Sequence, residues 1–216
     1  MKAIIPKIII VDLDGTLNYH ILSRVVNFFN LVIGLLLKNL KLRDLKILIN
    51  FRKLQEISFK KDMQINEVFE LLACRFSVSP DYIKGIRDRW MVNNQGLALK
   101  ISKRGWLIKR IHNLRRNGVL VAVWSDNPVN KKICYLGVNL DYNLTSEALD
   151  INLGKPSPKG LKQIISYFHL TSSDAIMIGD RKDRDGEAAR RAGVKFLKIG
   201  IRTRFFLYKL GKNIKR

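Results

Sequence analysis

The stretch from Lys7 to Leu17, KIIIVDLDGTL, constrains the fold of this 216-residue chain more than any other. Four consecutive β-branched residues, from Ile8 to Val11, form an apolar run that is typical of a strand buried on both faces. Asp12 and Asp14 follow, and side chains two residues apart in an extended segment point to the same side. Open α/β sheets bind ligands at the carboxyl ends of their strands, so we expect both carboxylates to meet one ligand. Taken alone, the stretch also fits an ordinary turn after a strand.

The second half of the chain alternates between predicted helices and strands. This alternation predicts an α/β fold with a doubly wound, Rossmann-like parallel sheet. The tail, residues 202–216, holds six Lys and Arg and no acid, which indicates a solvated or anion-facing end. The expected helices are 106–116, one reaching about residue 135, 159–168 and 186–192, and the expected strands are 119–124, a short one near Leu140, 175–178 and 195–199.

Residues 18–98 are predicted to form an all-helical insert between the first strand and the alternating half. Residues 25–37 are almost wholly apolar, and as a helix they would cover about 20 Å, short of the ~30 Å core of a bilayer. Further helices are expected over the basic stretch 38–61, over 65–76, and from Ser79-Pro80 through Trp90. The breaker cluster 93–96 is a candidate boundary. We therefore expect a core of residues 1–17 and 99–216 and an insert of residues 18–98.

The formal net charge of +22 comes from forty Lys and Arg against eighteen Asp and Glu. Such a surface attracts anions, and the candidates are a phosphorylated substrate, nucleic acid and an anionic membrane. A basic bias of the whole proteome would give the same excess. Cys74 and Cys134 match no metal spacing and are predicted to be reduced core thiols. The N-terminus lacks a signal-peptide pattern, so we expect a cytoplasmic protein, with peripheral contact to a membrane left open.

Groups that carry chemistry follow four predicted strands or loops. Asp12 and Asp14 follow the first, Ser125 ends the second beside backbone amides that suit a phosphate, and Lys155 lies in a Gly-Lys-Pro-Ser-Pro loop. The fourth is the stretch GDRKDRDG, which holds Asp180, Asp183 and Asp185. Each has an ordinary explanation as a cap, a turn or a solvated charge. Together, the converging carboxylates imply a hard divalent cation such as Mg²⁺, and a Lys and a Ser suit phosphate oxygens.

These motifs resemble, in order, those of the haloacid dehalogenase superfamily. Residues 12–17 (DLDGTL) look like its first motif, 123–126 (VWSD) its second, 154–158 (GKPSP) its third and 178–185 its fourth. Ser146-Glu147 is similar to the loop before the third motif. The second motif commonly has Asn after its Ser or Thr, where this chain has Asp126. The insert resembles the cap that closes over the site in these proteins.

The resemblance implies a role for each residue. Asp12 would be the nucleophile that forms an aspartyl-phosphate, and Asp14 the general acid and then the base. Ser125 and Asp126 of the second motif, with Lys155, would form the phosphate site. Magnesium would be held by Asp12, Asp180 and the backbone carbonyl of Asp14. Asp185 would act through a water or by fixing Lys155, with Asp183 a weaker candidate for the same place.

The leading interpretation is a Mg²⁺-dependent phosphatase of a small-molecule or lipid-linked phosphomonoester. Within the superfamily, true dehalogenases lack an acid at the place of Asp14, whereas phosphomutases share both aspartates, so phosphoryl transfer remains an alternative. A non-catalytic basic protein that binds nucleic acid or an anionic membrane is the alternative from another class. His20, His112 and His169 are isolated and are expected to be structural.

Overall fold

The computed structural model describes residues 5–37, 39–61, 63–145 and 154–214. Within these residues, five parallel strands form one sheet in the order β3-β2-β1-β4-β5. The central strand β1 is fully buried, as its apolar run predicts. The strands are β1 (Ile8–Val11), β2 (Leu120–Ser125), β3 (Tyr142–Thr145), β4 (Ala175–Gly179) and β5 (Lys195–Lys198).

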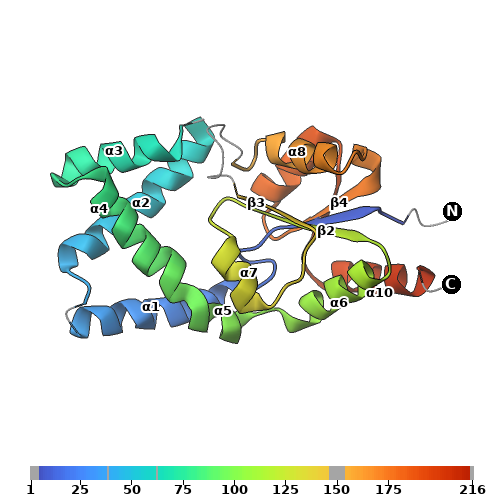
Figure 1. Ribbon diagram of the computed structural model, residues 1–216, viewed down its shortest axis with the longest axis horizontal. Helices are drawn as coiled ribbons and strands as arrows, with labels where there is room; N and C mark the ends of the chain where they lie inside the picture. The colour runs from blue at the N-terminus through green and yellow to red at the C-terminus, as the bar shows by residue number, and fades with distance from the viewer. Residues whose placement is uncertain (1–4, 38, 62, 146–153, 215–216) are drawn as a thin grey trace.

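Helices cover both faces of this sheet, which confirms the predicted doubly wound α/β fold (Figure 1). Alternate residues of β1 enter different hydrophobic clusters, because successive side chains of a strand point to opposite faces. Ile8 and Ile10 pack with α8 (Lys159–Tyr167) and α9 (Glu187–Ala192). Ile9 and Val11 pack in the other cluster, which draws its helical residues from α5 (Gly96–Ser102), α6 (Gly105–Arg116), α7 (Asn130–Leu136) and α10 (Ile201–Asn213).

A helical cap lies between β1 and β2, beside the end of the sheet (Figure 1). It has its own hydrophobic cluster, which includes Phe51, Leu72 and Ile83. The helix expected from Ser79-Pro80 is present, and Ser79 is its N-cap residue, since its side chain accepts a hydrogen bond from the backbone N–H of Tyr82. Its elements are α1 (His20–Leu36), α2 (Leu42–Lys61), α3 (Ile65–Phe76), α4 (Pro80–Arg87), a π-helical turn (Asp88–Val92), a 3₁₀ turn (Asn93–Gln95) and α5 (Gly96–Ser102).

The connection between core and cap differs in detail from the expected break. Residues 93–96 continue the helical run into α5 through the 3₁₀ turn. An isolated antiparallel bridge between Asn18 and Lys103 joins the two chain segments that enter and leave the cap. The division of the chain at residues 17/18 and 98/99 stays a prediction.

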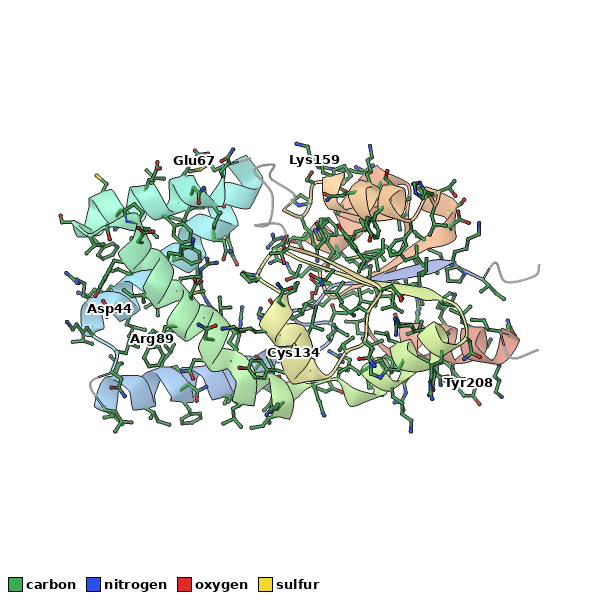
Figure 2. The ribbon with its side chains drawn as sticks, viewed as in Figure 1. Asp44, Glu67, Arg89, Cys134, Lys159 and Tyr208 are labelled. Atoms are coloured by element: carbon green, nitrogen blue, oxygen red, sulfur yellow. The ribbon has the colours of Figure 1, made fainter. Side chains whose placement is uncertain are left out.

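Two predictions from the sequence concern burial, and one of them is wrong. The basic residues of the tail that the structure describes are exposed, as predicted, but Thr203, Leu207 and Leu210 share one face of α10 and are buried, with α10 packed on α6. Cys74 and Cys134 (the latter labelled in Figure 2) are exposed, because other residues of their helices, such as Leu72 and Leu136, take the buried face. The strand expected near Leu140 begins at Tyr142. No helix within the described ranges is long and apolar enough to cross a membrane.

Candidate active site

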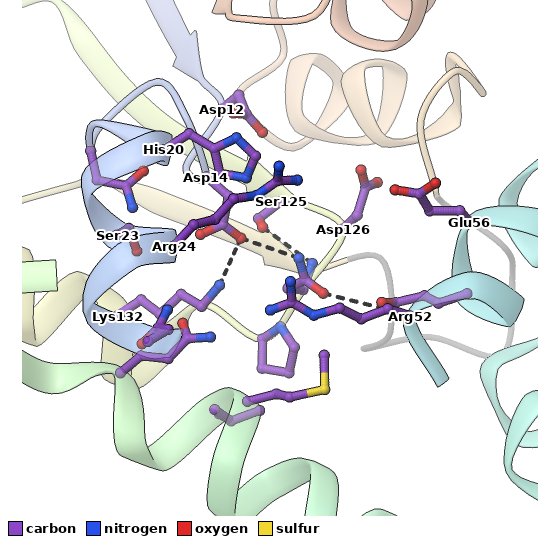
Figure 3. A pocket seen from close by; sticks show the side chains of 18 of the residues that line it. Asp12, Asp14, His20, Ser23, Arg24, Arg52, Glu56, Ser125, Asp126 and Lys132 are labelled. Carbon is purple, nitrogen blue, oxygen red and sulfur yellow. Dashed lines mark hydrogen bonds and ion pairs between the residues drawn. The ribbon is translucent and has the colours of Figure 1, made fainter. Parts of the chain in front are cut away.

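The predicted site residues converge at the carboxyl ends of β1, β2 and β4, in a cleft between core and cap. The cleft has a volume of about 210 Å³, and Asp12, Asp14, Ser125, Asp180 and Asp185 all line it. Figure 3 shows side chains reaching the cleft from both lobes. Parallel strands bring their carboxyl ends to one edge of the sheet, so residues more than 100 positions apart in the chain become neighbours.

Three carboxylates form a compact cluster at this edge. Asp12, Asp180 and Asp185 each offer one oxygen, and these oxygens lie within 4.8 Å of one another. Two glycines make room for the cluster: a Cβ on Gly15, whose φ is +95°, would collide with the Asp180 carboxylate, and a Cβ on Gly179 would collide with Asp185. The side chain of Asp14 is not a member of this cluster.

Lys155 is buried beneath the carboxylates and connects two of them. Its Nζ lies 2.5 Å from Asp12 Oδ1 and 2.8 Å from Asp185 Oδ1. Its backbone N–H donates to Asp126 Oδ1 at 2.9 Å, and Arg184 pairs with Asp126 Oδ2 at 2.8 Å. Arg184 also donates to the carbonyl of Lys155 at 3.1 Å. The Asp126 carboxylate therefore holds the Lys155 loop in place.

The ionisation of this cluster reflects burial among like charges. Burial raises the pKa of Asp12 to about 8, with a further rise from Asp185 and Asp180, although Lys155 opposes it. Burial and then Asp185 also raise the pKa of Asp180. Burial disfavours the charged form of Lys155, but Asp12 and Asp185 outweigh it and raise its pKa. The cluster is thus short of positive charge, and an added cation would favour the ionised carboxylates.

Asp14 is held separately, on the cleft side, by two residues of the core. Lys132 Nζ lies 2.7 Å from Asp14 Oδ2, and Asn127 Nδ2 donates to the same oxygen at 3.1 Å. Burial alone would raise the pKa of Asp14, but Lys132 and Asn127 outweigh it and lower the pKa. Asn127 also accepts a hydrogen bond from Gln55 of α2 at 3.2 Å, so a cap residue touches this arrangement. Figure 3 shows both contacts to Asp14 as dashed lines.

Sequence reasoning missed Lys132, and it did not predict that Asn127 contacts Asp14. Lys131 and Lys132 are neighbours in the sequence, yet Lys132 is buried at 2% exposure while Lys131 is exposed. The side of the helix on which each lysine lies could have distinguished them, but predicting that side requires knowing the first residue of α7 to within one position.

The remaining candidates take different places. Asp185 is buried in the cluster, whereas Asp183 is exposed and pairs with Arg181 at 2.8 Å. Ser125 is buried, and its Oγ accepts a hydrogen bond from the N–H of Asn127 at 3.2 Å. Ser146-Glu147 lies outside the described residues.

The three histidines lie in different environments. His112 Nε2 accepts the backbone N–H of Asn139 at 3.0 Å, which is a structural contact. His169 has a left-handed φ of 53° in the turn after α8. His20 lines the cleft beside Asp14, and burial and then Arg24 lower its pKa.

Two arginines of the cap add positive charge to the cleft. Arg24 of α1 and Arg52 of α2 both line it, and Figure 3 shows them pointing inward from the cap. Burial and then the like charge of Arg24 lower the pKa of Arg52. Like charges held together in a cleft favour an anionic ligand.

A family model described as "Haloacid dehalogenase-like hydrolase" matches residues 9–199. A curated relative, phosphoserine phosphatase from Thermus thermophilus, is 26% identical over 84 residues, which are 38% of this chain and 34% of the relative. The match thus spans about a third of that relative's length.

Solved structures share the overall fold over most of the chain. The 2-haloacid dehalogenase of Pseudomonas syringae is 20% identical with a TM-score of 0.61, and the match covers 88% of this chain and 85% of that one. The hydrolase YfnB of Bacillus subtilis, solved bound to magnesium, is 13% identical with a TM-score of 0.62 and coverage of 88% and 87%. At these identities the likeness shows the fold alone.

Proposed function

Because this chain belongs to the haloacid dehalogenase-like hydrolases, we propose that it is a magnesium-dependent phosphatase that hydrolyses a phosphomonoester through an aspartyl-phosphate. The observation that carries the proposal is Asp14, a second carboxylate two residues after Asp12 that faces the cleft. A leaving alkoxide needs a proton, whereas a leaving halide does not. The placement of Asp14 therefore favours hydrolysis of a phosphate ester over dehalogenation.

Asp12 is the proposed nucleophile. Thr16 Oγ1 donates to Asp12 Oδ2 at 3.0 Å, and Lys155 contacts Oδ1, so two partners orient the carboxylate. In the first step an oxygen of Asp12 bonds to phosphorus, the ester P–O bond breaks, and Asp14 gives its proton to the leaving oxygen. In the second step Asp14 takes a proton from water, the hydroxide attacks phosphorus, and phosphate leaves Asp12.

The contacts of Asp14 suit both of its proposed roles. Lys132 and Asn127 stabilise its ionised form, which is the form that accepts a proton from water. An anionic phosphate that enters the cleft brings a like charge toward Asp14 and disfavours the carboxylate, which raises its pKa. Substrate binding therefore favours the protonated form of Asp14, which is the form that the first step needs.

The carboxylate cluster fits Mg²⁺ in its donor set. Oxygen ligands suit this ion, and Asp12, Asp180 and Asp185 bring three carboxylates together, two of them buried, with Lys155 as the cation that contacts Asp12 and Asp185. We propose that Asp12, Asp180 and the backbone carbonyl of Asp14 hold the ion, with Asp185 acting through a water or by fixing Lys155. Bound there, magnesium would supply positive charge to the phosphoryl oxygens.

Phosphate binding is assigned to Ser125, Lys155 and the backbone after Ser125. The Asp126 carboxylate is engaged by Arg184 and by the Lys155 amide, so we propose that Asp126 serves this site through its backbone and through the loop that it holds. Arg24 and Arg52 support a small anionic substrate that reaches beyond the phosphoryl group toward the cap. A lipid-linked phosphate fits the same charges, and the cytoplasmic location stays a prediction.

A phosphate-release screen tests this proposal. The purified protein is offered a panel of phosphomonoesters with magnesium and with a chelator, beside Asp12→Asn and an exposed control, Asp183→Asn. We expect metal-dependent turnover that Asp12→Asn abolishes and Asp183→Asn keeps. Equal release by the wild type and Asp12→Asn would contradict it. Transfer of phosphate to a second hydroxyl compound without net release would favour the phosphomutase alternative, and salt-sensitive DNA binding without any turnover would favour the non-catalytic one.

A further inference from the structure

The cap helix α1 exposes seven of its apolar side chains to solvent, whereas Val26, Leu31, Val32 and Leu35 are half-buried. Ile21, Phe28 and Leu36 have exposed fractions of 80%, 62% and 75%. The exposed residues recur every three or four positions, so they form one stripe along the helix. We call this surface the α1 stripe, and it consists of Ile21, Leu22, Val25, Phe28, Phe29, Ile33 and Leu36.

The opposite side of α1, which faces the protein, is polar or small. Ser23 and Gly34 are its buried residues, and a Cβ on Gly34 would collide with the ring of Trp90. Asn30 Nδ2 donates to the carbonyl of Asn94 at 3.4 Å, and Asn27 lines the cleft. A surface helix ordinarily turns its apolar side inward and its polar side outward. In α1 the fully buried residues are small and most of the apolar ones are exposed, which leaves the α1 stripe open over the described part of the molecule.

Neighbouring elements extend the apolar surface and surround it with positive charge. Leu97 and Ile101 of α5, the helix packed beside α1, are 59% and 53% exposed. Lys100 and Lys103 are exposed next to them in the sequence. Residues 15–43 and 89–125, which include α1, α5 and α6, contain no Asp or Glu but twelve Lys and Arg, of which Arg24 lines the cleft. Figure 1 shows α1, α5 and α6 following one another along one side of the molecule.

We propose that the α1 stripe docks on the surface of an anionic lipid bilayer. Apolar side chains flanked by cations match the boundary between acyl chains and anionic headgroups, where a helix lies in the plane of the membrane. The 17 residues of α1 are too few to cross a bilayer, and α1 is packed along the cap, so it lies on the surface.

Charge complementarity selects this occupant over a second copy of the chain. A symmetric dimer through the α1 stripe would place the same acid-free segments of two molecules against each other, and like charges across an interface cost free energy. Anionic lipids neutralise these cations instead. The polar side of α1 lines the cleft, so docking would bring the cleft to within about one helix diameter, roughly 10–12 Å, of the headgroups.

Vesicle flotation at low and high salt tests this docking without reference to the reaction. The full chain is mixed with vesicles of phosphatidylcholine alone or with one third phosphatidylglycerol. The test variant is F28Q/F29Q, whose side chains are 62% and 57% exposed, and the matched control is Leu71→Gln on α3, which is 49% exposed. Thermal unfolding of each variant checks that it is folded, and sedimentation velocity measures its oligomeric state.

We expect the wild type and Leu71→Gln to float with the anionic vesicles at low salt and less at high salt. F28Q/F29Q should lose more than about tenfold in partitioning, because two large apolar side chains no longer enter the interface. Absence of wild-type binding to anionic vesicles at low salt would overturn the docking. Binding unchanged in F28Q/F29Q would overturn the role of the α1 stripe, and so would a dimer that F28Q/F29Q dissociates. Vesicle binding of the inactive Asp12→Asn separates this inference from the proposed reaction.

Discussion

The core and the cap place their polar and apolar side chains differently. In the core, helices turn apolar sides to the sheet, and the key polar groups are each held by several partners, as Lys155 is by Asp12, Asp185 and Asp126. In the cap, α1 turns polar side chains toward the cleft and apolar ones outward. The core arrangement suits one fixed reaction geometry. The cap arrangement suits recognition of what approaches the cleft, so substitutions in the two lobes should have different consequences.

The largest effect on stability is expected from the core helix α10. Leu207 is fully buried, and Leu207→Ala should lower the free energy of unfolding by about 2–5 kcal/mol, since it removes transfer free energy and leaves a cavity. Phe205→Ala, at a side chain 64% exposed on the same helix, should change it by less than about 0.5 kcal/mol. Denaturant unfolding measures both. An equally small change in the free energy of unfolding for both substitutions would mean that Leu207 is not packed against the core.

In the core, Lys132→Met should reduce phosphate release at neutral pH on the order of tenfold to a hundredfold. Lys132 lowers the pKa of Asp14, so its removal raises that pKa and moves the pH–rate profile to higher pH. Lys162→Met, at an exposed position of α8, is the control. An unchanged pH–rate profile in Lys132→Met would mean that the ionisation of Asp14 does not determine the pH dependence of the rate.

Magnesium should stabilise the wild type by binding the folded state. At one hundred times its Kd the gain is about 2.7 kcal/mol, or roughly 5–10 °C in Tm for a chain of this size. Asp180→Asn should lose the magnesium-dependent shift, and its metal-free Tm should not fall, because it removes repulsion within the cluster. Asp183→Asn should keep the full shift, since Asp183 pairs with Arg181 outside the cluster. Loss of the shift in Asp183→Asn alone would reverse that assignment.

The smallest effects are expected from the cap. Arg24→Gln and Arg52→Gln should each raise KM about three- to tenfold and leave kcat nearly unchanged, because these charges attract the substrate without touching the reacting bond. Arg89→Gln, at an exposed cap position that does not line the cleft, is the control. A fall in kcat with constant KM would instead place the cap arginines in the reaction itself.

The core and the convergence of its site residues were predictable because strong local signals coincide there. Asp12 and Asp14 follow an apolar strand, and Ser125 and Asp180 end two others. Because the carboxyl ends of parallel strands lie at one edge of the sheet, these residues could be predicted to lie close together. The helices of the cap were predictable as helices, and α3 has the predicted bounds. The substrate-facing surface of the cap was not, because it depends on how those helices rotate about their axes.

Burial at single positions needs tertiary packing that the sequence does not display. Lys131 and Lys132 are the same residue type at adjacent positions in the sequence, yet only Lys132 is buried against Asp14. The basic tail buries Leu207 and Leu210 because α6 lies beside it. The apolar α1 remains exposed because its polar side faces the cleft. In each case the available partner decides burial, and composition does not.

Trapping of the aspartyl-phosphate tests the central claim most directly. Asp14→Asn is mixed with magnesium and p-nitrophenyl phosphate. The nitrophenolate of this substrate leaves without a general acid, so the first step proceeds, whereas the second step lacks its general base. We predict a burst of one nitrophenol per enzyme and, by mass spectrometry of the intact protein and its peptides, one phosphoryl group on Asp12. Asp12→Asn/Asp14→Asn should show neither. Full steady-state turnover by Asp14→Asn, or a burst that persists in the double variant, would contradict the account.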